Sequence, residues 1–172
     1  MELQNVSDIV KDCGFGVFTG ALENGGSVRG INAKGQGSMP RKKIDALVDF
    51  AKGYGAKGLA YIAIHEDGSY KSSFAKFMTE DEMNAILKKT GAEKGDVILI
   101  VADKIKNHVL TVLGALRQKV AKKLDIIPEG KYNFLWITEF PFFEYDEELK
   151  QFVAMHHPFT APAVDSIDDL RA

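Results

Sequence analysis

The order of the predicted strands and helices in the N-terminal half is the feature that most constrains the fold. Residues 15–23 and 28–33 are short apolar or β-branched runs on either side of an Asn-Gly-Gly-Ser sequence. Asn-Gly and Gly-Gly favour tight turns, so this pattern predicts a β-hairpin. From Arg41 onward apolar residues recur at helical spacing until the glycines of residues 53–55, which predicts a helix after the hairpin.

A second unit of the same kind follows. Residues 59–64 and 74–78 are strand candidates around the turn sequence at 65–68, and Thr79 with the acidic residues after it is typical of a helix start. The resulting order ββαββα predicts an α+β fold. We expect a two-layer sandwich, in which both helices cover one face of an antiparallel four-stranded sheet.

After Gly91 the pattern changes. Residues 97–102 predict a buried strand, and residues 104–124 predict a long amphipathic helix with one apolar stripe that belongs to a core. The other face of this helix carries Lys119, Lys122 and Lys123. Two interpretations of these lysines stay open: contacts with RNA phosphates, or an ordinary solvated face.

The segment 125–130, with Pro128 and Gly130, predicts a domain boundary, which we place between residues 1–127 and 128–172. Beyond it, strand-like runs around Trp136 and around His156 are joined by an acidic turn, which predicts a C-terminal β-hairpin. No covering helix accompanies this hairpin, and a hairpin by itself is marginally stable. We therefore expect the second segment to depend on sequence outside this chain.

His156 and His157 are the candidate binding residues of the C-terminal segment. Successive residues of a strand point to opposite faces of the sheet, so only one of the two can face a given pocket. An imidazole donates a hydrogen bond to a carboxylate or phosphate in either protonation state, which suits an acidic ligand. The opposed directions and the lack of a third ligand nearby argue against a metal site. A pair that only bonds the backbone at the strand end is the alternative.

The net charge, the cysteine content and the distribution of apolar residues limit the possible partners and location of the protein. The chain has 172 residues, a net charge of -2 and one cysteine, Cys13. Any contact with nucleic acid must therefore come from a local basic face, and an internal disulfide is excluded. With neither a secretory signal nor a long uncharged apolar run, we expect a cytoplasmic protein without a membrane segment.

The sequence Gly53-Tyr54-Gly55-Ala56-Lys57-Gly58 has the spacing of a dinucleotide-binding loop. That loop needs a strand before it and a helix after it, whereas here a helix precedes and a strand follows. We predict that these glycines end a helix instead.

Several segments, taken in order, strongly resemble bacterial-type aspartyl-tRNA synthetase, including its GAD insertion domain. They are Gly55-Ala56-Lys57-Gly58-Leu59-Ala60-Tyr61-Ile62, Gly114-Ala115-Leu116-Arg117, Phe134-Leu135-Trp136-Ile137, the run from Phe140 to Glu144 and the run from His156 to Thr160. The resemblance implies a GAD domain followed by strands of a class II catalytic domain. It also implies a parent enzyme that joins aspartate to tRNA with ATP and Mg²⁺ and that forms a homodimer.

Within that resemblance, His156 and His157 correspond to residues that line the pocket for aspartate or its adenylate. The arginine motifs that hold ATP in this family do not occur in the chain, and Glu139 stands where many relatives have aspartate. We therefore assign no catalytic residue, expect no cofactor for the isolated chain and predict that it is inactive alone. The alternative function is a stand-alone tRNA- or protein-binding module.

Overall fold

The structure is a computed structural model that describes residues 1–138, 140–146, 149–155, 164, 166 and 168–169. It divides into two compact units, Met1–Glu129 and Gly130–Ala172. His156 and His157 lie outside the described residues.

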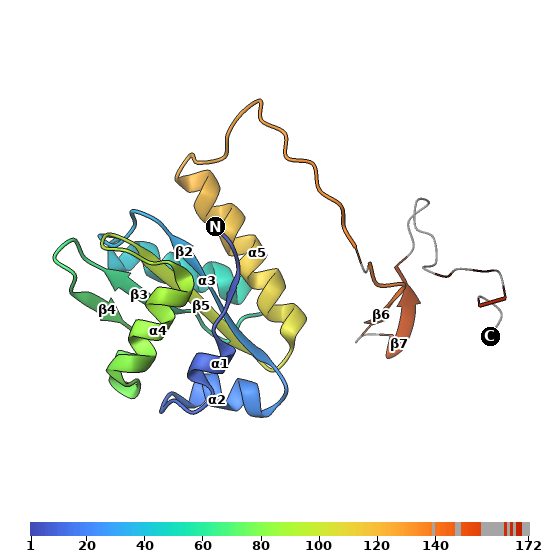
Figure 1. The fold of residues 1–172 in the computed structure, drawn as a ribbon, viewed down its shortest axis with the longest axis horizontal. Coiled ribbons are helices and arrows are strands. Elements are labelled where there is room, and N and C mark those ends of the chain that lie inside the picture. The colour runs from blue at the N-terminus through green and yellow to red at the C-terminus, as the bar shows by residue number, and fades with distance from the viewer. Residues whose placement is uncertain (139, 147–148, 156–163, 165, 167, 170–172) are drawn as a thin grey trace. The chain divides into compact units, whose positions relative to one another are not determined.

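The first unit is built on a five-stranded sheet with the order β1-β2-β5-β3-β4 (Figure 1). Each strand is antiparallel to its neighbours. The strands are β1 (Gln4–Asn5), β2 (Ser27–Ala33), β3 (Ala60–Ile64), β4 (Tyr70–Ser72) and β5 (Val97–Asp103). The last strand of the unit thus lies at the centre of the sheet.

Five α-helices and one short 3₁₀ helix accompany this sheet among the described residues. They are α1 (Ser7–Val10), α2 (Gly16–Glu23), α3 (Arg41–Gly53), η1 (Ala75–Phe77), α4 (Glu80–Thr90) and α5 (Lys106–Lys123). Helices α3 and α5 pack on one face of the sheet. Helices α1, α2 and α4 pack on the other. The sheet therefore lies between two helical layers.

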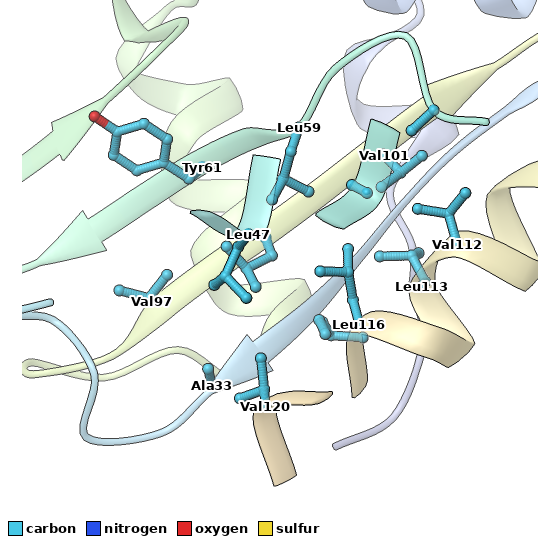
Figure 2. Packing of buried hydrophobic residues seen from close by; sticks show 14 of the residues in the cluster. Ala33, Leu47, Leu59, Tyr61, Val97, Val101, Val112, Leu113, Leu116 and Val120 are labelled. Atoms are coloured by element: carbon cyan, nitrogen blue, oxygen red, sulfur yellow. The ribbon is translucent and has the colours of Figure 1, made fainter. Parts of the chain in front are cut away.

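The central strand β5 explains why both faces are covered. Its Val97, Leu99 and Val101 pack with α3 and α5, whereas Ile98 and Ile100 pack with the other helices. All five side chains are at most 1% exposed. A strand that is apolar on both faces needs a layer on each side. In Figure 2 the α5 residues Leu113 and Leu116 point toward the strands of the sheet.

The α+β class, the antiparallel sheet and the separate hairpin are confirmed. The expected placement of both helices on one face of a four-stranded sheet is wrong, because α3 and α4 pack on opposite faces. Residues 97–102, predicted outside the sheet, are the centre of a sheet of five strands, and their apolar side chains on both faces require a helical layer on each. Residues 15–23, predicted as a strand, form α2 instead. Residues 74–78 are also not a strand: β4 lies earlier, and residues 75–77 form the 3₁₀ helix.

The glycines that follow α3 end the helix, as predicted. Gly55 has φ +90°, its N–H donates to the carbonyl of Lys52, and the N–H of Ala56 donates to that of Ala51. This pair of bonds is a Schellman motif, which uses the left-handed conformation that glycine adopts without strain. The strand β3 begins only after this turn, so residues 53–58 have the reverse order of a dinucleotide-binding loop.

One buried carboxylate joins the loops at one end of the sheet. Asp96 is 4% exposed and accepts hydrogen bonds from the Asn32 side-chain amide at 2.9 Å and from the N–H groups of Gly35 and Glu93 at 2.9 and 3.0 Å. Burial, the largest single effect, raises the pKa of Asp96, but the hydrogen bonds from Asn32, Glu93 and Gly35 together outweigh it and leave the pKa below its ordinary value. The ionised side chain thus fixes three chain segments.

The second unit contains a β-hairpin of β6 (Phe143–Asp146) and β7 (Gln151–Ala154). The predicted hairpin is therefore confirmed, with its strands on either side of the acidic turn. The predicted strand around Trp136 is not formed, and the Trp136 side chain is 94% exposed. A strand needs a neighbour for its backbone hydrogen bonds, and the described part of this unit provides none for residues 134–137.

Candidate nucleic-acid interface

The candidate functional surface of the first unit is a groove between α3 and α5. It has a volume of about 600 Å³. Phe50 of α3 and Tyr54, the residue that follows α3, form one wall, and Lys119 and Lys122 of α5 belong to the other. The remaining lining residues are Leu110, Thr111, Gly114, Ala115 and Gln118. Of the residues that the structure describes, no carboxylate lines this groove.

Helical spacing explains how each wall forms. Tyr54, which caps the end of α3, is four residues after Phe50, and the centroids of the two rings lie 5.0 Å apart. The end of α3 at Tyr54 leaves that ring 49% exposed. Lys119 and Lys122 are three residues apart on α5 and so lie on the same side of the helix. The Lys119 Nζ is 4.8 Å from the centre of the Phe50 ring, which ties the two walls together.

The floor of the groove is open because α5 has small residues there. A Cβ atom added at Gly114 would meet no atom within 4 Å. Gly114 and Ala115 were part of the segments that carry the family resemblance, but their contribution to a groove depends on the packing of α3 against α5. Sequence analysis identified the lysines of this site and missed Phe50 and Tyr54, whose spacing on α3 was the available signal.

A second basic hollow lies at the start of α3. Its lining includes Arg41, Tyr61, His65 and Lys71, and its volume is about 450 Å³. Arg41 is held by Asp45, with 2.8 Å between Nε and Oδ1, and its Nη1 donates to the Tyr61 hydroxyl at 3.4 Å. The hydrogen bond with Asp45, the largest effect, raises the pKa of the already basic Arg41. These contacts anchor α3 to β3.

The hollow on the opposite layer is mainly apolar. It has a volume of about 530 Å³ and is lined by Phe15, Phe18 and Leu59 among others. Two of its polar residues have partners in the fold: Asp103 accepts a hydrogen bond from the N–H of Ile105 at 2.8 Å, and Ser73 accepts one from the N–H of Tyr61 at 3.2 Å. Its lining also includes Lys57 and Lys104.

The histidine site predicted from the sequence lies outside the described residues. The residue before it is described: the N–H of Met155 donates to the carbonyl of Phe142 at 2.9 Å, which continues the β6–β7 ladder by one bond. Among the described residues, no three His, Cys, Asp or Glu side chains are grouped so as to hold a metal ion.

Every helix in the described part of the chain is too short or too polar to span a membrane.

The fold and its two helical layers define an α+β domain with a central antiparallel sheet. A family model described as the GAD domain matches residues 18–113, which is more than half of the chain. The chain belongs to the GAD domain family.

Curated relatives extend the likeness to nearly the whole chain. The aspartate–tRNA(Asp/Asn) ligase of Lachnoclostridium phytofermentans is 65% identical over 94% of this chain and 27% of its own length. The aspartate–tRNA ligase of Agathobacter rectalis is 62% identical over 99% of this chain and 28% of its own length. The chain therefore spans little more than a quarter of these relatives. The resemblance to aspartyl-tRNA synthetases is confirmed.

Proposed function

We propose that the chain is a part of an aspartate–tRNA ligase, a class II synthetase that activates aspartate with ATP and transfers it to tRNA in the cytoplasm. The observation that carries this proposal is the identity of 62–65% to two such ligases over 94% or more of the chain. The whole enzyme would be a homodimer that uses Mg²⁺ with ATP. Residues 1–127 would be its GAD insertion domain, and residues 128–172 would be strands of its catalytic domain.

Within this proposal His156 and His157 contact the bound aspartate or its adenylate. A donating imidazole stabilises the substrate carboxylate by a charge-assisted hydrogen bond. The hydrogen bond between Met155 and Phe142 supports the proposal, since it continues the hairpin up to the residue before His156. Side chains near a paired strand are held more firmly than those on a free loop. Strand alternation favours one histidine as the contact and the other as its support.

Magnesium and ATP would be held by other parts of the whole enzyme. The arginine motifs that hold ATP in this family do not occur in the chain. We therefore assign no step of the adenylation reaction to residues of this chain beyond the binding of aspartate.

The test uses the full-length enzyme that contains this segment. His156→Ala and His157→Ala are compared with His65→Ala, which changes a histidine in a surface turn of the first unit. The measurement is aspartate-dependent ATP–pyrophosphate exchange. We expect at least one of the first two variants to raise the KM for aspartate by about tenfold or more, the loss of one charge-assisted hydrogen bond. Unchanged kinetics in both would refute the assignment.

A stand-alone RNA- or protein-binding module is the second candidate function. The basic groove between α3 and α5 favours it, since that site lies within the first unit. The size of the native polypeptide in cell extract separates the two candidates. A band near 18.9 kDa would support the module, whereas a band several times heavier would support the ligase.

A further inference from the structure

The two helical layers of the first unit carry opposite charge. Helix α3 has four basic and two acidic side chains, and α5 has five basic and no acidic ones. Helices α1, α2 and α4 together have two basic and five acidic side chains. The layer formed by α3 and α5 thus has an excess of seven positive charges, although the net charge of the whole chain is -2. A one-sided basic surface of this kind attracts polyanions.

The groove between α3 and α5 combines this positive charge with exposed aromatic rings. The Tyr54 ring is 49% exposed beside Phe50, and both rings face a hollow that is bounded on the other side by Lys119 and Lys122. Exposed aromatic rings beside cations are what proteins use to bind unpaired nucleotides: bases stack on the rings and phosphates lie along the cations.

We infer that the groove between α3 and α5 binds an unpaired stretch of RNA. A base would stack on Tyr54, and the phosphates that follow it would lie along Lys119 and Lys122. Gly114 and Ala115 leave room on the floor for the sugar. That the RNA is a tRNA rests on the function proposed above; that the groove takes RNA rests on its own residues.

The same observations favour RNA over other polyanions. In an RNA duplex the bases are stacked on one another inside the helix, so they cannot reach Tyr54. An acidic peptide would use the lysines but has no need of two adjacent aromatic rings. An anionic membrane surface favours a convex face with protruding apolar side chains, whereas this site is a hollow.

The experiment uses the 172-residue chain and a fluorescein-labelled oligouridylate of about eight nucleotides, with binding followed by fluorescence anisotropy from 50 to 200 mM salt. Replacing both lysines (Lys119→Gln with Lys122→Gln) is expected to weaken binding at least tenfold. The slope of log affinity against log salt should become shallower by about 1.4, since each phosphate contact to a single strand contributes about 0.7. Tyr54→Ala should weaken binding by fivefold or more, and Tyr54→Phe should restore it.

The matched control removes two positive charges from the helical layer on the opposite face of the sheet. Lys88→Gln with Lys89→Gln on α4 removes two lysines that lie outside the groove and is expected to leave binding within twofold. Circular dichroism of each variant establishes that the fold is retained.

Three results would overturn the inference. One is the absence of binding at 50 mM salt. Another is equal binding of a duplex of the same length with no effect of Tyr54→Ala, which would mean attraction by charge alone. The third is lysine-dependent binding to phosphatidylserine vesicles without binding to the oligouridylate. Aspartate-dependent ATP–pyrophosphate exchange by the full-length lysine variants should stay unchanged, so a failure here is separate from a failure of the proposed ligase function.

Discussion

Lys119 and Phe50 join the two helices that carry the candidate interface: the ammonium nitrogen of Lys119 lies 4.8 Å from the centre of the Phe50 ring. A cation–π contact at a solvent-exposed site contributes about 0.5–1 kcal/mol. A double-mutant cycle with Lys119→Gln and Phe50→Leu, measured by urea unfolding, should therefore show a coupling of about 0.5 kcal/mol or more. The same cycle with Lys123→Gln in place of Lys119→Gln should be additive within about 0.3 kcal/mol. Equal coupling in both cycles would contradict the contact.

The buried carboxylate of Asp96 predicts a loss of stability in acid. Its pKa is below the ordinary value of 3.8 in the folded chain. The stabilisation is therefore complete above that ordinary value and is lost as the pH falls through the lower pKa of the folded state. Asp96→Asn would replace one of the two accepting oxygens by an NH2 group, which cannot accept from Asn32, Gly35 or Glu93, and should reduce the free energy of unfolding at pH 7 by about 2–4 kcal/mol.

The control for this prediction is Asp67→Asn. Asp67 accepts two hydrogen bonds from Ser69, chiefly that of the hydroxyl group, and these lower its pKa, but the side chain is exposed. Water can replace both bonds, so the substitution should have little effect. Unfolding curves at pH 7 and pH 3 test both residues. If Asp96→Asn lost no more stability than Asp67→Asn, the role assigned to Asp96 would be wrong.

The start of α4 provides a prediction that follows from a single pair of side chains. The N–H of Glu82 donates to the Thr79 hydroxyl at 3.3 Å, and the N–H of Thr79 donates to the Glu82 carboxylate at 2.8 Å. This capping box satisfies two backbone donors at the helix end. Thr79→Ala should lower the unfolding free energy by about 1 kcal/mol, and Thr79→Ser should recover most of that loss. Thermal unfolding of the original chain and the two variants tests this prediction. Equal losses of stability in Thr79→Ala and Thr79→Ser would contradict the role of the Thr79 hydroxyl group as a helix cap.

How far the sequence predicts the fold depends on whether local signals agree with the packing. The helix at Arg41–Gly53 and the capping box at Thr79 were predictable, because spacing, caps and glycines all indicate the same element. The strand Val97–Asp103 was predictable as buried, but not as central, because register depends on partners far away in sequence.

Helix α2 shows how conflicting signals misled the prediction. Glycines at 14, 16 and 20 lower helix propensity, and the Asn-Gly-Gly sequence favours a hairpin turn. In the structure Phe18 is buried against Phe15 and Phe74, and Gly25 and Gly26 donate to the carbonyls of Leu22 and Ala21 in a Schellman motif. Tertiary burial thus outweighs local propensity. Tertiary packing also explains why Phe50 and Tyr54 were not predicted as part of the candidate interface. The two rings form a wall of the groove only when α5 packs beside α3.

Gly37 and Gly114 differ in the space around them, so the same substitution by alanine should have opposite effects on stability. A Cβ atom at Gly37 would collide with the carbonyl oxygen of Ile64 and with the backbone of Gly95, to which the Gly37 N–H already donates at 2.6 Å. Backbone cannot move aside as a flexible side chain does, so Gly37→Ala should cost about 2 kcal/mol or more of unfolding free energy. Gly114 lies within α5 and faces open space, so Gly114→Ala should stabilise the chain by about 0.5–1 kcal/mol through its higher helix propensity.

Urea unfolding of both alanine variants at pH 7 gives the comparison. Opposite signs are expected from the same chemical change, because Gly37 is in close contact with backbone whereas Gly114 lies within a helix and faces open space. The Gly114 variant also places a methyl group on the floor of the groove between α3 and α5. Since one methyl group occupies little of a hollow of about 600 Å³, RNA binding by this variant should change less than twofold. If Gly37→Ala left the free energy of unfolding unchanged, the close contact of Gly37 with Ile64 and Gly95 would be wrong. If Gly114→Ala lowered it, the open surroundings of Gly114 in α5 would be wrong.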